Sequence, residues 1–321
     1  LSDELEDEIQ RVIESDFEGV PSPVGTQLGR EVIEVGALDD YIEFAKNTIP
    51  FNLNGLKVAL DCANGASYMS SVRAFRELGA DVYVINDNPD GTNINEKCGS
   101  THPEELMEYV VKKGCDIGFA FDGDADRCLA VDEKGNLING DFILAICGKH
   151  LKEINRLKDN TLVVTVMSNL GLDIACNELG MNTLKTKVGD RYVLEEMIKG
   201  KYVLGGEQSG HIIFSKHATT GDGILTSLKV VETMVENKRT LAQLTEAVDI
   251  YPQLLINVRV TDKKKAQEDP DVQAAVKEVE EILGSDGRIL VRESGTEPVV
   301  RVMVEAQSDE ICHENVLKVV N

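Results

Sequence analysis

The sequence has no tryptophan, no Cys-x-x-Cys pair, no long apolar run and no excess of basic residues. None of its apolar stretches approaches the ~18 residues that a membrane span needs, so we expect no membrane-spanning segment. Lys and Arg total 33 against 56 Asp and Glu, which gives a formal net charge of −23. Such a surface repels nucleic acid and anionic lipid, so we expect neither as a partner.

The seven cysteines are odd in number and scattered, which fits neither a disulfide framework nor a zinc cluster. We expect core thiols in a reducing compartment, and therefore a cytoplasmic location. Hydrophobic residues make up 42% of the chain, enough to bury a core, and 321 residues allow two or three domains. The chain begins at Leu1, inside a helical pattern and without Met, which indicates a start cut from a longer protein.

Hydrophobic periodicity predicts an α/β fold class. Residues 1–15 predict a short amphipathic helix, and a Gly- and Pro-containing stretch to about residue 36 resembles a linker. Residues 56–121 and 161–206 each alternate predicted strands and helices in a shared layout. The tail from residue 254 predicts β-α-β-β-α. We therefore expect two consecutive α/β domains of similar topology plus a smaller C-terminal α+β domain.

The expected domains are a first-domain remnant with linker at 1–35, an α/β domain with a metal-binding loop at 36–140, an α/β domain with a sugar-binding loop at 141–252, and a phosphate-binding α+β domain at 253–321.

The sharpest motif is Asp122-Gly-Asp124-Ala-Asp126-Arg127, which follows an apolar strand. Three carboxylates in a tight loop repel one another unless they share a cation, and they can converge on Mg²⁺. Arg127 can then hold a phosphate oxygen by charge-assisted hydrogen bonds. An EF-hand is excluded because Arg127 stands where that loop requires Gly. The alternative is a solvated acidic turn, but apolar strands on both sides favour metal binding.

Residues 205–211 form a glycine-rich segment in which Glu207 and Ser209 can bond sugar hydroxyls. Taken alone, the segment is also typical of an ordinary turn. His211 at its end is more typical of a packed or capped histidine than of a catalyst.

Two further segments can bind anions. Residues 292–301 offer hydroxyls, backbone N–H groups and two guanidinium groups for a phosphate cradle, although a polar hairpin turn fits equally well. Its candidate ligands are Arg292, Ser294, Gly295, Thr296 and Arg301. A second segment lies at a strand-to-helix junction, where a helix N-terminus favours an anion and Asp190 can also cap the helix. Its candidate residues are Lys187, Gly189, Asp190 and Arg191.

These segments, in this order along nearly the whole chain, resemble the α-D-phosphohexomutase superfamily, and most closely its bacterial phosphoglucosamine mutase branch. The resemblance implies that Asp122, Asp124 and Asp126 hold Mg²⁺ and that Arg127 supports the transferring phosphoryl group. It implies that Glu207 and Ser209 bind sugar hydroxyls. It also implies that the phosphate that is not transferred is bound by Arg292, Ser294, Gly295, Thr296 and Arg301. We further expect the substrate to contact Gly189, Asp190, Arg191 and His211.

The implied reaction interconverts glucosamine 6-phosphate and glucosamine 1-phosphate through a phosphoserine and a bisphosphorylated intermediate, on the route to UDP-N-acetylglucosamine for the cell wall. The implied partner is a small hexosamine phosphate, and a homodimer is left open. The alternatives are a phosphomannomutase or phosphoglucomutase of the same superfamily, or a sugar-phosphate-binding module without catalysis.

One departure from the family pattern bears on activity. Members carry the phosphorylated serine in a Ser-His-Asn-Pro-type loop of the first domain, and no Ser-His-Asn stretch occurs among these 321 residues. Lys187 and His211 are only substitute candidates for a general base that the same domain can supply. We therefore expect this chain alone to lack mutase activity.

Overall fold

The computed structural model describes residues 3–294 and 297–320. The chain divides into two compact units, Leu1–Leu38 and Asp39–Asn321. The first unit holds helix α1 (Asp3–Glu14) and the 3₁₀ helix η1 (Gly25–Gln27), with exposed irregular chain around η1. Helix α1 confirms the helix predicted near the start.

The second unit begins within α2 (Ala37–Lys46) and contains two α/β layers. The first layer is built on a sheet with the strand order β2-β1-β3-β4-β5. Strands β2, β1 and β3 run parallel to one another, β4 runs antiparallel to β3, and β5 runs antiparallel to β4. Its strands are β1 (Lys57–Asp61), β2 (Asp81–Ile85), β3 (Ile117–Phe121), β4 (Cys128–Asp132) and β5 (Leu137–Ile138). Its helices are α3 (Ser67–Glu77), η2 (Gly99–Thr101) and α4 (Glu104–Lys113).

The second layer repeats this plan with the order β7-β6-β8-β9, where only β9 is antiparallel. Its strands are β6 (Thr161–Thr165), β7 (Asn182–Thr186), β8 (Leu204–Gly206) and β9 (Ile212–Phe214). Its helices are α5 (Gly140–Glu153), η3 (Lys158–Asn160), α6 (Leu170–Glu178), α7 (Asp190–Gly200), α8 (Gly223–Asn237) and α9 (Leu241–Thr245). The matching strand orders confirm the predicted pair of similar α/β domains.

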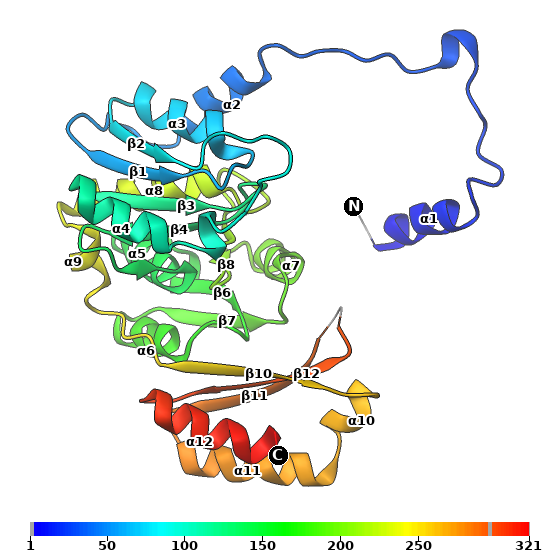
Figure 1. Cartoon of the computed structure of the whole chain (residues 1–321), viewed down its shortest axis with the longest axis vertical. Coiled ribbons are helices and arrows are strands. Elements are labelled where there is room, and N and C mark those ends of the chain that lie inside the picture. Colours follow the sequence, from blue (N-terminus) through cyan, green and yellow to red (C-terminus); the bar gives the residue numbers. More distant parts are fainter. Residues whose placement is uncertain (1–2, 295–296, 321) are drawn as a thin grey trace. The chain divides into compact units, whose positions relative to one another are not determined.

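The C-terminal part is a three-stranded antiparallel sheet in the order β10-β12-β11. Its elements are β10 (Gln253–Arg259), α10 (Lys263–Gln267), α11 (Pro270–Leu283), β11 (Arg288–Glu293), β12 (Val299–Glu305) and α12 (Asp309–Val320). Helices α11 and α12 cover one face of this sheet (Figure 1) and share a separate apolar core with it. The smaller α+β domain that the sequence predicts is therefore present.

Helix α8 joins the two α/β layers. It contacts β4 of the first sheet, β9 of the second, and the helices α3 and α5. Most of its side chains are buried, as expected for a helix that is covered on nearly all sides. Every one of the seven cysteines is also buried and unpaired, which confirms the expectation of core thiols. Among the described helices, none combines the length and the apolar character that crossing a membrane demands.

A buried ion pair fastens the C-terminal sheet to the second α/β layer. Arg288 contacts both carboxylate oxygens of Glu305, at 2.6 Å through Nε and 3.0 Å through Nη2. The same guanidinium donates to the carbonyls of Val166 (3.1 Å) and Ser168 (2.5 Å). Glu305 is fully buried and also accepts from the Leu170 N–H at 2.8 Å. The pair is thus hydrogen-bonded on both sides, which a buried charge requires.

Asp141, in the first turn of α5, lies next to the Arg288–Glu305 ion pair, because Asn169 contacts both carboxylates. Its Oδ2 accepts from the Asn169 N–H at 2.8 Å, and its buried Oδ1 has no hydrogen-bond partner among the described residues. Burial raises the pKa of Asp141 to about 6, and the Asn169 hydrogen bond opposes that shift.

Because this pKa lies above the value of about 3.9 for an unfolded aspartate, ionisation of Asp141 opposes folding. The associated stability is complete below about pH 4 and is lost as the pH rises through 6. Asparagine cannot ionise, so Asp141→Asn removes the part of the pH dependence of stability that comes from Asp141. We expect the unfolding free energy of the variant, relative to wild type, to rise by about 2–3 kcal/mol between pH 4 and 6.5.

Urea denaturation at stepped pH measures this difference, and titrations common to both proteins cancel in it. The control is Asp286→Asn, which removes one charge at an exposed turn. A difference that stays flat across this window contradicts the assignment.

Candidate functional site

Two loops occupy equivalent places in the two α/β layers. Residues 122–127, the acidic loop, connect β3 to the antiparallel β4, and residues 207–211, the glycine loop, connect β8 to the antiparallel β9. An isolated antiparallel β-bridge between the backbones of Arg127 and His211 joins the two loops. The Cys128 N–H also donates to the Gly210 carbonyl at 3.1 Å. The repeat therefore brings these two polar loops together.

Gly210 permits this contact. Its φ is +93°, and a Cβ there would lie 2.4 Å from the carbonyl oxygen of Cys128. Side chains cannot occupy that space, so glycine is required by the protein's own backbone. Gly205 serves strand packing in a similar way, since a Cβ there would lie 2.7 Å from the Val163 carbonyl oxygen. At these two positions the close neighbour is protein, whereas the sequence suggested approach to a ligand.

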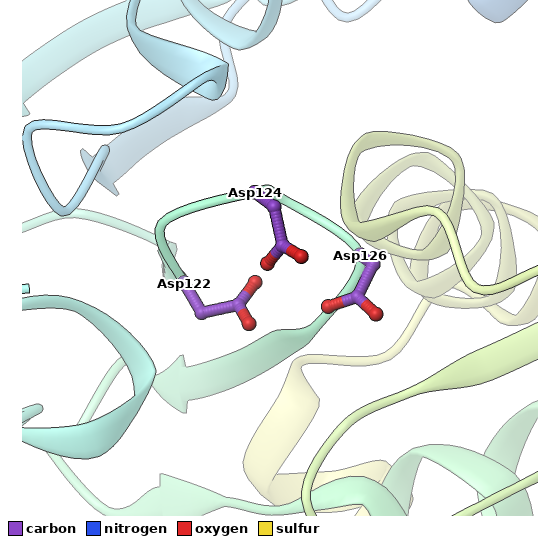
Figure 2. Close-up of side chains that lie close together, drawn as sticks. All are labelled: Asp122, Asp124 and Asp126. Atoms are coloured by element: carbon purple, nitrogen blue, oxygen red, sulfur yellow. The ribbon is translucent and has the colours of Figure 1, made fainter. Parts of the chain in front are cut away.

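The three aspartates of the acidic loop converge. Figure 2 shows their carboxylates pointing toward one another across the loop, and each offers an oxygen within 4.8 Å of the others. Asp122 is buried, Asp126 is half-buried and Asp124 is exposed. Apolar strands on both sides, buried along their whole length, hold the loop at the sheet edge. This arrangement differs from a solvated acidic turn, because one carboxylate is removed from water.

Arg127 neutralises part of this charge. Its Nε lies 2.7 Å from Asp122 Oδ2, and its backbone N–H donates to Asp122 Oδ1 at 3.1 Å. Burial nevertheless raises the pKa of Asp122 to about 6, with Asp126 and Asp124 adding to the shift and Arg127 opposing it. Asp126 Oδ1 is buried and has no hydrogen-bond partner among the described residues. Asp126 Oδ1 also lies 3.5 Å from Arg127 Nε, so two of the three carboxylates share one guanidinium group and the loop carries more negative charge than Arg127 balances.

His211 orients Asp126 from the other layer. Its Nδ1 lies 2.9 Å from Asp126 Oδ2, and its Nε2 accepts from the Gly221 N–H at 2.9 Å. Since Nε2 accepts a hydrogen bond, the ring is neutral and Nδ1 carries the proton. The side chain is only 5% exposed. In this structure, both nitrogens of His211 are used within the protein, as in the packed histidine that the sequence favoured.

The segment from Lys187 to Arg191 meets the glycine loop. The Gly189 N–H donates to Glu207 Oε1 at 3.0 Å, just before α7 begins at Asp190. Asp190 Oδ2 lies 3.9 Å from His211 Nε2. Glu207 is therefore oriented by a backbone N–H at a helix start.

Three of the residues singled out from the sequence have exposed side chains. The Lys187 ammonium lies 5.7 Å from the centre of the Tyr192 ring, and Arg191 pairs with Glu195 on its own helix at 2.9 Å. Ser209 is exposed. Each of these side chains is exposed to solvent at the surface of the second layer.

Arg292 and Arg301 face each other across the C-terminal sheet. They are register partners on the antiparallel strands β11 and β12. Like charges directly opposite one another destabilise a sheet. The Nε atoms of both are buried without a hydrogen-bond partner in the described part of the chain. Burial and the neighbouring Arg301 lower the pKa of Arg292, whereas Glu207 opposes this. Arg301 Nη2 already pairs with Glu297 Oε2 at 3.0 Å, and an anion beside the two guanidinium groups would supply the acceptor that both Nε atoms lack.

The loop between these strands is only partly described. Ser294 is buried, and its Oγ accepts from the Glu297 N–H at 3.2 Å. Gly295 and Thr296 lie outside the described residues.

The sequence reasoning missed three residues near these loops. Lys263 donates through Nζ to the Ser294 carbonyl at 2.6 Å and so fixes the loop that follows β11. Tyr41 donates to Asp222 at 2.9 Å, and Asp222 caps the N-terminus of α8. The run of three lysines at 263–265 and the Gly-Asp-Gly of residues 221–223 were the available signals. Their partners are distant in sequence, so neither signal identified a contact.

Comparison with protein families identifies each of the three folded parts. The phosphoglucomutase/phosphomannomutase models for alpha/beta/alpha domain II, alpha/beta/alpha domain III and the C-terminal domain match residues 39–135, 139–251 and 255–320.

Relatives and solved structures agree with these matches. The chain is 68% identical to the phosphoglucosamine mutase of Clostridium beijerinckii over 98% of its own length and 71% of the relative's. It is 61% identical to that of Clostridium novyi over 97% of its own length and 70% of the relative's. A phosphoglucomutase/phosphomannomutase family protein from Burkholderia thailandensis superposes with a TM-score of 0.78 at 25% identity, covering 98% of this chain and 68% of that one.

The Aspergillus fumigatus N-acetylphosphoglucosamine mutase, solved with GlcNAc-6P and magnesium, shares the fold with a TM-score of 0.70 at 21% identity. That match covers 88% of this chain and 68% of the other. With two α/β layers of matching strand order, a C-terminal α+β sheet and relatives of this identity, the chain belongs to the phosphoglucosamine mutase family of phosphohexomutases.

Proposed function

We propose that this chain supplies the metal, sugar and phosphate sites of a mutase that interconverts glucosamine 6-phosphate and glucosamine 1-phosphate. The observation that carries the proposal is the join between the acidic loop and the glycine loop, made by the Arg127–His211 bridge and the His211–Asp126 contact. This join supports a cation site in the acidic loop that works together with Glu207 of the glycine loop, in a chain 68% identical to a phosphoglucosamine mutase.

Asp122, Asp124 and Asp126 are the residues that would hold Mg²⁺. Three carboxylates with oxygens within 4.8 Å of one another suit a hard divalent cation. Asp126 Oδ1, which lies 3.5 Å from Arg127 Nε and accepts no hydrogen bond from the described residues, fits a role as ligand. The bound cation would neutralise charge on a phosphoryl oxygen. Arg127 adds a fixed positive charge beside Asp122 and can hold another oxygen of the same group.

Arg292 and Arg301 would bind the phosphate that is not transferred, together with Ser294 and, outside the described residues, Gly295 and Thr296. Two facing guanidinium groups match the geometry and charge of a phosphate dianion. This pair also explains how a chain of net charge −23 attracts an anion. The two groups lie on the adjacent strands β11 and β12, and Glu297 pairs with Arg301 at 3.0 Å, so the anion would be held by fixed donors rather than by an excess of local charge.

Glu207 and Ser209 would bind hydroxyl groups of the sugar between these two ends. The Gly189 N–H holds one oxygen of Glu207, which leaves the other available as an acceptor. Gly189, Asp190 and Arg191 would line the same ligand at the start of α7, and His211 would act through Asp126. Lys187 remains our candidate for proton transfer, since it is exposed beside this segment.

The phosphoryl donor is the remaining requirement. Phosphoryl transfer depends on positioning a donor in a field of matched charge. We assign the donor to a phosphoserine in a Ser-His-Asn-Pro-type loop, and these 321 residues contain no Ser-His-Asn stretch. The chain alone would therefore bind the sugar phosphate without isomerising it.

This proposal is tested by calorimetry and by product analysis on the 321-residue chain with Mg²⁺ present. We expect glucosamine 6-phosphate to bind, and no glucosamine 1-phosphate to form when a hexose bisphosphate activator is added. Turnover at the rate of an intact relative contradicts the expected inactivity. Preferential binding of mannose 6-phosphate or glucose 6-phosphate would reassign the substrate, and absence of binding by all three would overturn the proposed site.

Replacement of Asp124 tests the metal ligands. Asp124→Asn removes one charged oxygen ligand from a hard cation, so we expect Mg²⁺ affinity to fall by at least about tenfold. Asp124 is exposed, so the fold should tolerate the change. Isothermal titration with Mg²⁺ measures the effect, and Asp286→Asn controls for the loss of one negative charge. Equal affinity in Asp124→Asn and wild type would remove this loop from the metal site.

Replacement of Arg301 tests the phosphate pair. Arg301→Ala removes half of the facing guanidinium pair, and we expect the dissociation constant for glucosamine 6-phosphate to rise roughly tenfold or more. The thermal midpoint of the free chain should change little, because the substitution removes both the repulsion from Arg292 and the ion pair with Glu297. The control is Arg259→Ala, at an exposed position on β10 of the same sheet. Unchanged affinity in Arg301→Ala would exclude the C-terminal sheet from the site.

A further inference from the structure

A cavity lies in the unit Asp39–Asn321, and none of the residues that line it belongs to the candidate site. Its volume is about 610 Å³, within the range of small-molecule sites. The walls come from residues 47–50 after α2, from α5 and α8, and from residues on either side of the β8–β9 pair. It therefore lies where the first α/β layer meets the second.

The cavity has an apolar floor. Ile49 and Phe214 contribute side chains that are 6% and 5% exposed, and Val203 and Leu151 line the wall beside them. Ile154 extends the apolar surface toward solvent, at 37% exposure. An apolar lining of this kind accommodates the carbon skeleton of an organic ligand.

The carboxylates in the cavity already have partners. Lys229, a nearly buried residue of α8, donates to Glu232 at 2.8 Å and to the carbonyl of Thr48 at 2.5 Å. His150 contacts Glu236 through Nε2 at 3.1 Å, while the Asn237 side chain lies 3.2 Å from its Nδ1. Both carboxylates among the described lining residues, Glu232 and Glu236, therefore have a neighbouring nitrogen as partner.

Two cationic side chains have no such partner. Arg156 and Lys216 line the cavity at exposed positions, and within residues 3–294 and 297–320 neither side chain forms a hydrogen bond or an ion pair. The pKa of His217, another lining residue, is lowered by burial and by the charges of Lys229 and Lys216. The cavity is thus positive on a chain whose net charge is −23. Negative ligands are attracted to such a local field.

We infer that this cavity binds a small organic anion, with an apolar body over Ile49 and Phe214 and a single acidic group at Arg156 and Lys216. A carboxylate, a sulfonate or a phosphate ester supplies the same charge and the same acceptor oxygens. Uncharged apolar molecules would leave the two cations unpaired, and polyanions without an apolar body would leave the floor empty. The site is independent of the sugar-phosphate site, with which it shares no residue.

The probe is 8-anilinonaphthalene-1-sulfonate, which combines aromatic rings with one sulfonate. Fluorescence titration of the 321-residue chain, repeated by calorimetry, should give saturable binding at one site. The double variant Arg156→Glu with Lys216→Glu should weaken that binding by at least about tenfold, because attraction becomes repulsion. The matched control, Arg76→Glu with Lys112→Glu, makes the same change in net charge at exposed positions elsewhere and should bind as wild type does.

A third variant examines the apolar lining of the cavity. Ile154→Asp adds a charge to a partly exposed wall without removing a core side chain, and it should also weaken binding. Thermal melts of all variants confirm that they are folded. Absence of saturable binding to wild type overturns the inference. Equal affinity in the two double variants also overturns it, because the probe would then occupy another apolar surface, such as the exposed side chains of α1.

Discussion

The contact between His211 and Asp126 is the one on which the site's arrangement depends. It joins a ring from the second α/β layer to a carboxylate from the first, at 2.9 Å. The Gly221 N–H fixes the opposite ring nitrogen, so the tautomer and the ring plane are set before any ligand binds. Each layer alone would present a polar loop at a sheet edge. Joined in this way, the loops hold convergent groups in fixed positions, which is what catalytic geometry requires.

The site also holds charged groups in positions that cost electrostatic free energy. Asp122, with its raised pKa, and the facing pair Arg292 and Arg301 are all held in arrangements that are unfavourable without a ligand. Such local destabilisation is common where a protein is built to bind a charged group. The acidic cluster favours a cation and the guanidinium pair favours an anion. In the function that we propose, a metal ion and a sugar phosphate together would relieve both.

Local patterns predicted much of the fold. The alternating elements at 56–121 and 161–206 indicated the two α/β layers, and glycines and apolar strands placed the loop motifs at strand ends. Helix α8 was not predicted, because most of its residues are buried and only Lys229, Glu232 and Glu236 mark a short charged stripe on it. The contacts of Lys263 with Ser294 and of Tyr41 with Asp222 were missed for another reason. They join residues distant in sequence, and periodicity reports only neighbours.

The position of α8 also bears on how the chain folds. By sequence it belongs to the second layer, yet it packs on β4 of the first as well as on β9. Without α8, the buried strand β4 would lose one of its covering helices. The two repeats look separable along the chain, and each has an apolar cluster of its own, as the C-terminal sheet does around Val304 and Val316. Because α8 covers strands of both repeats, we expect the two repeats to unfold together rather than one after the other.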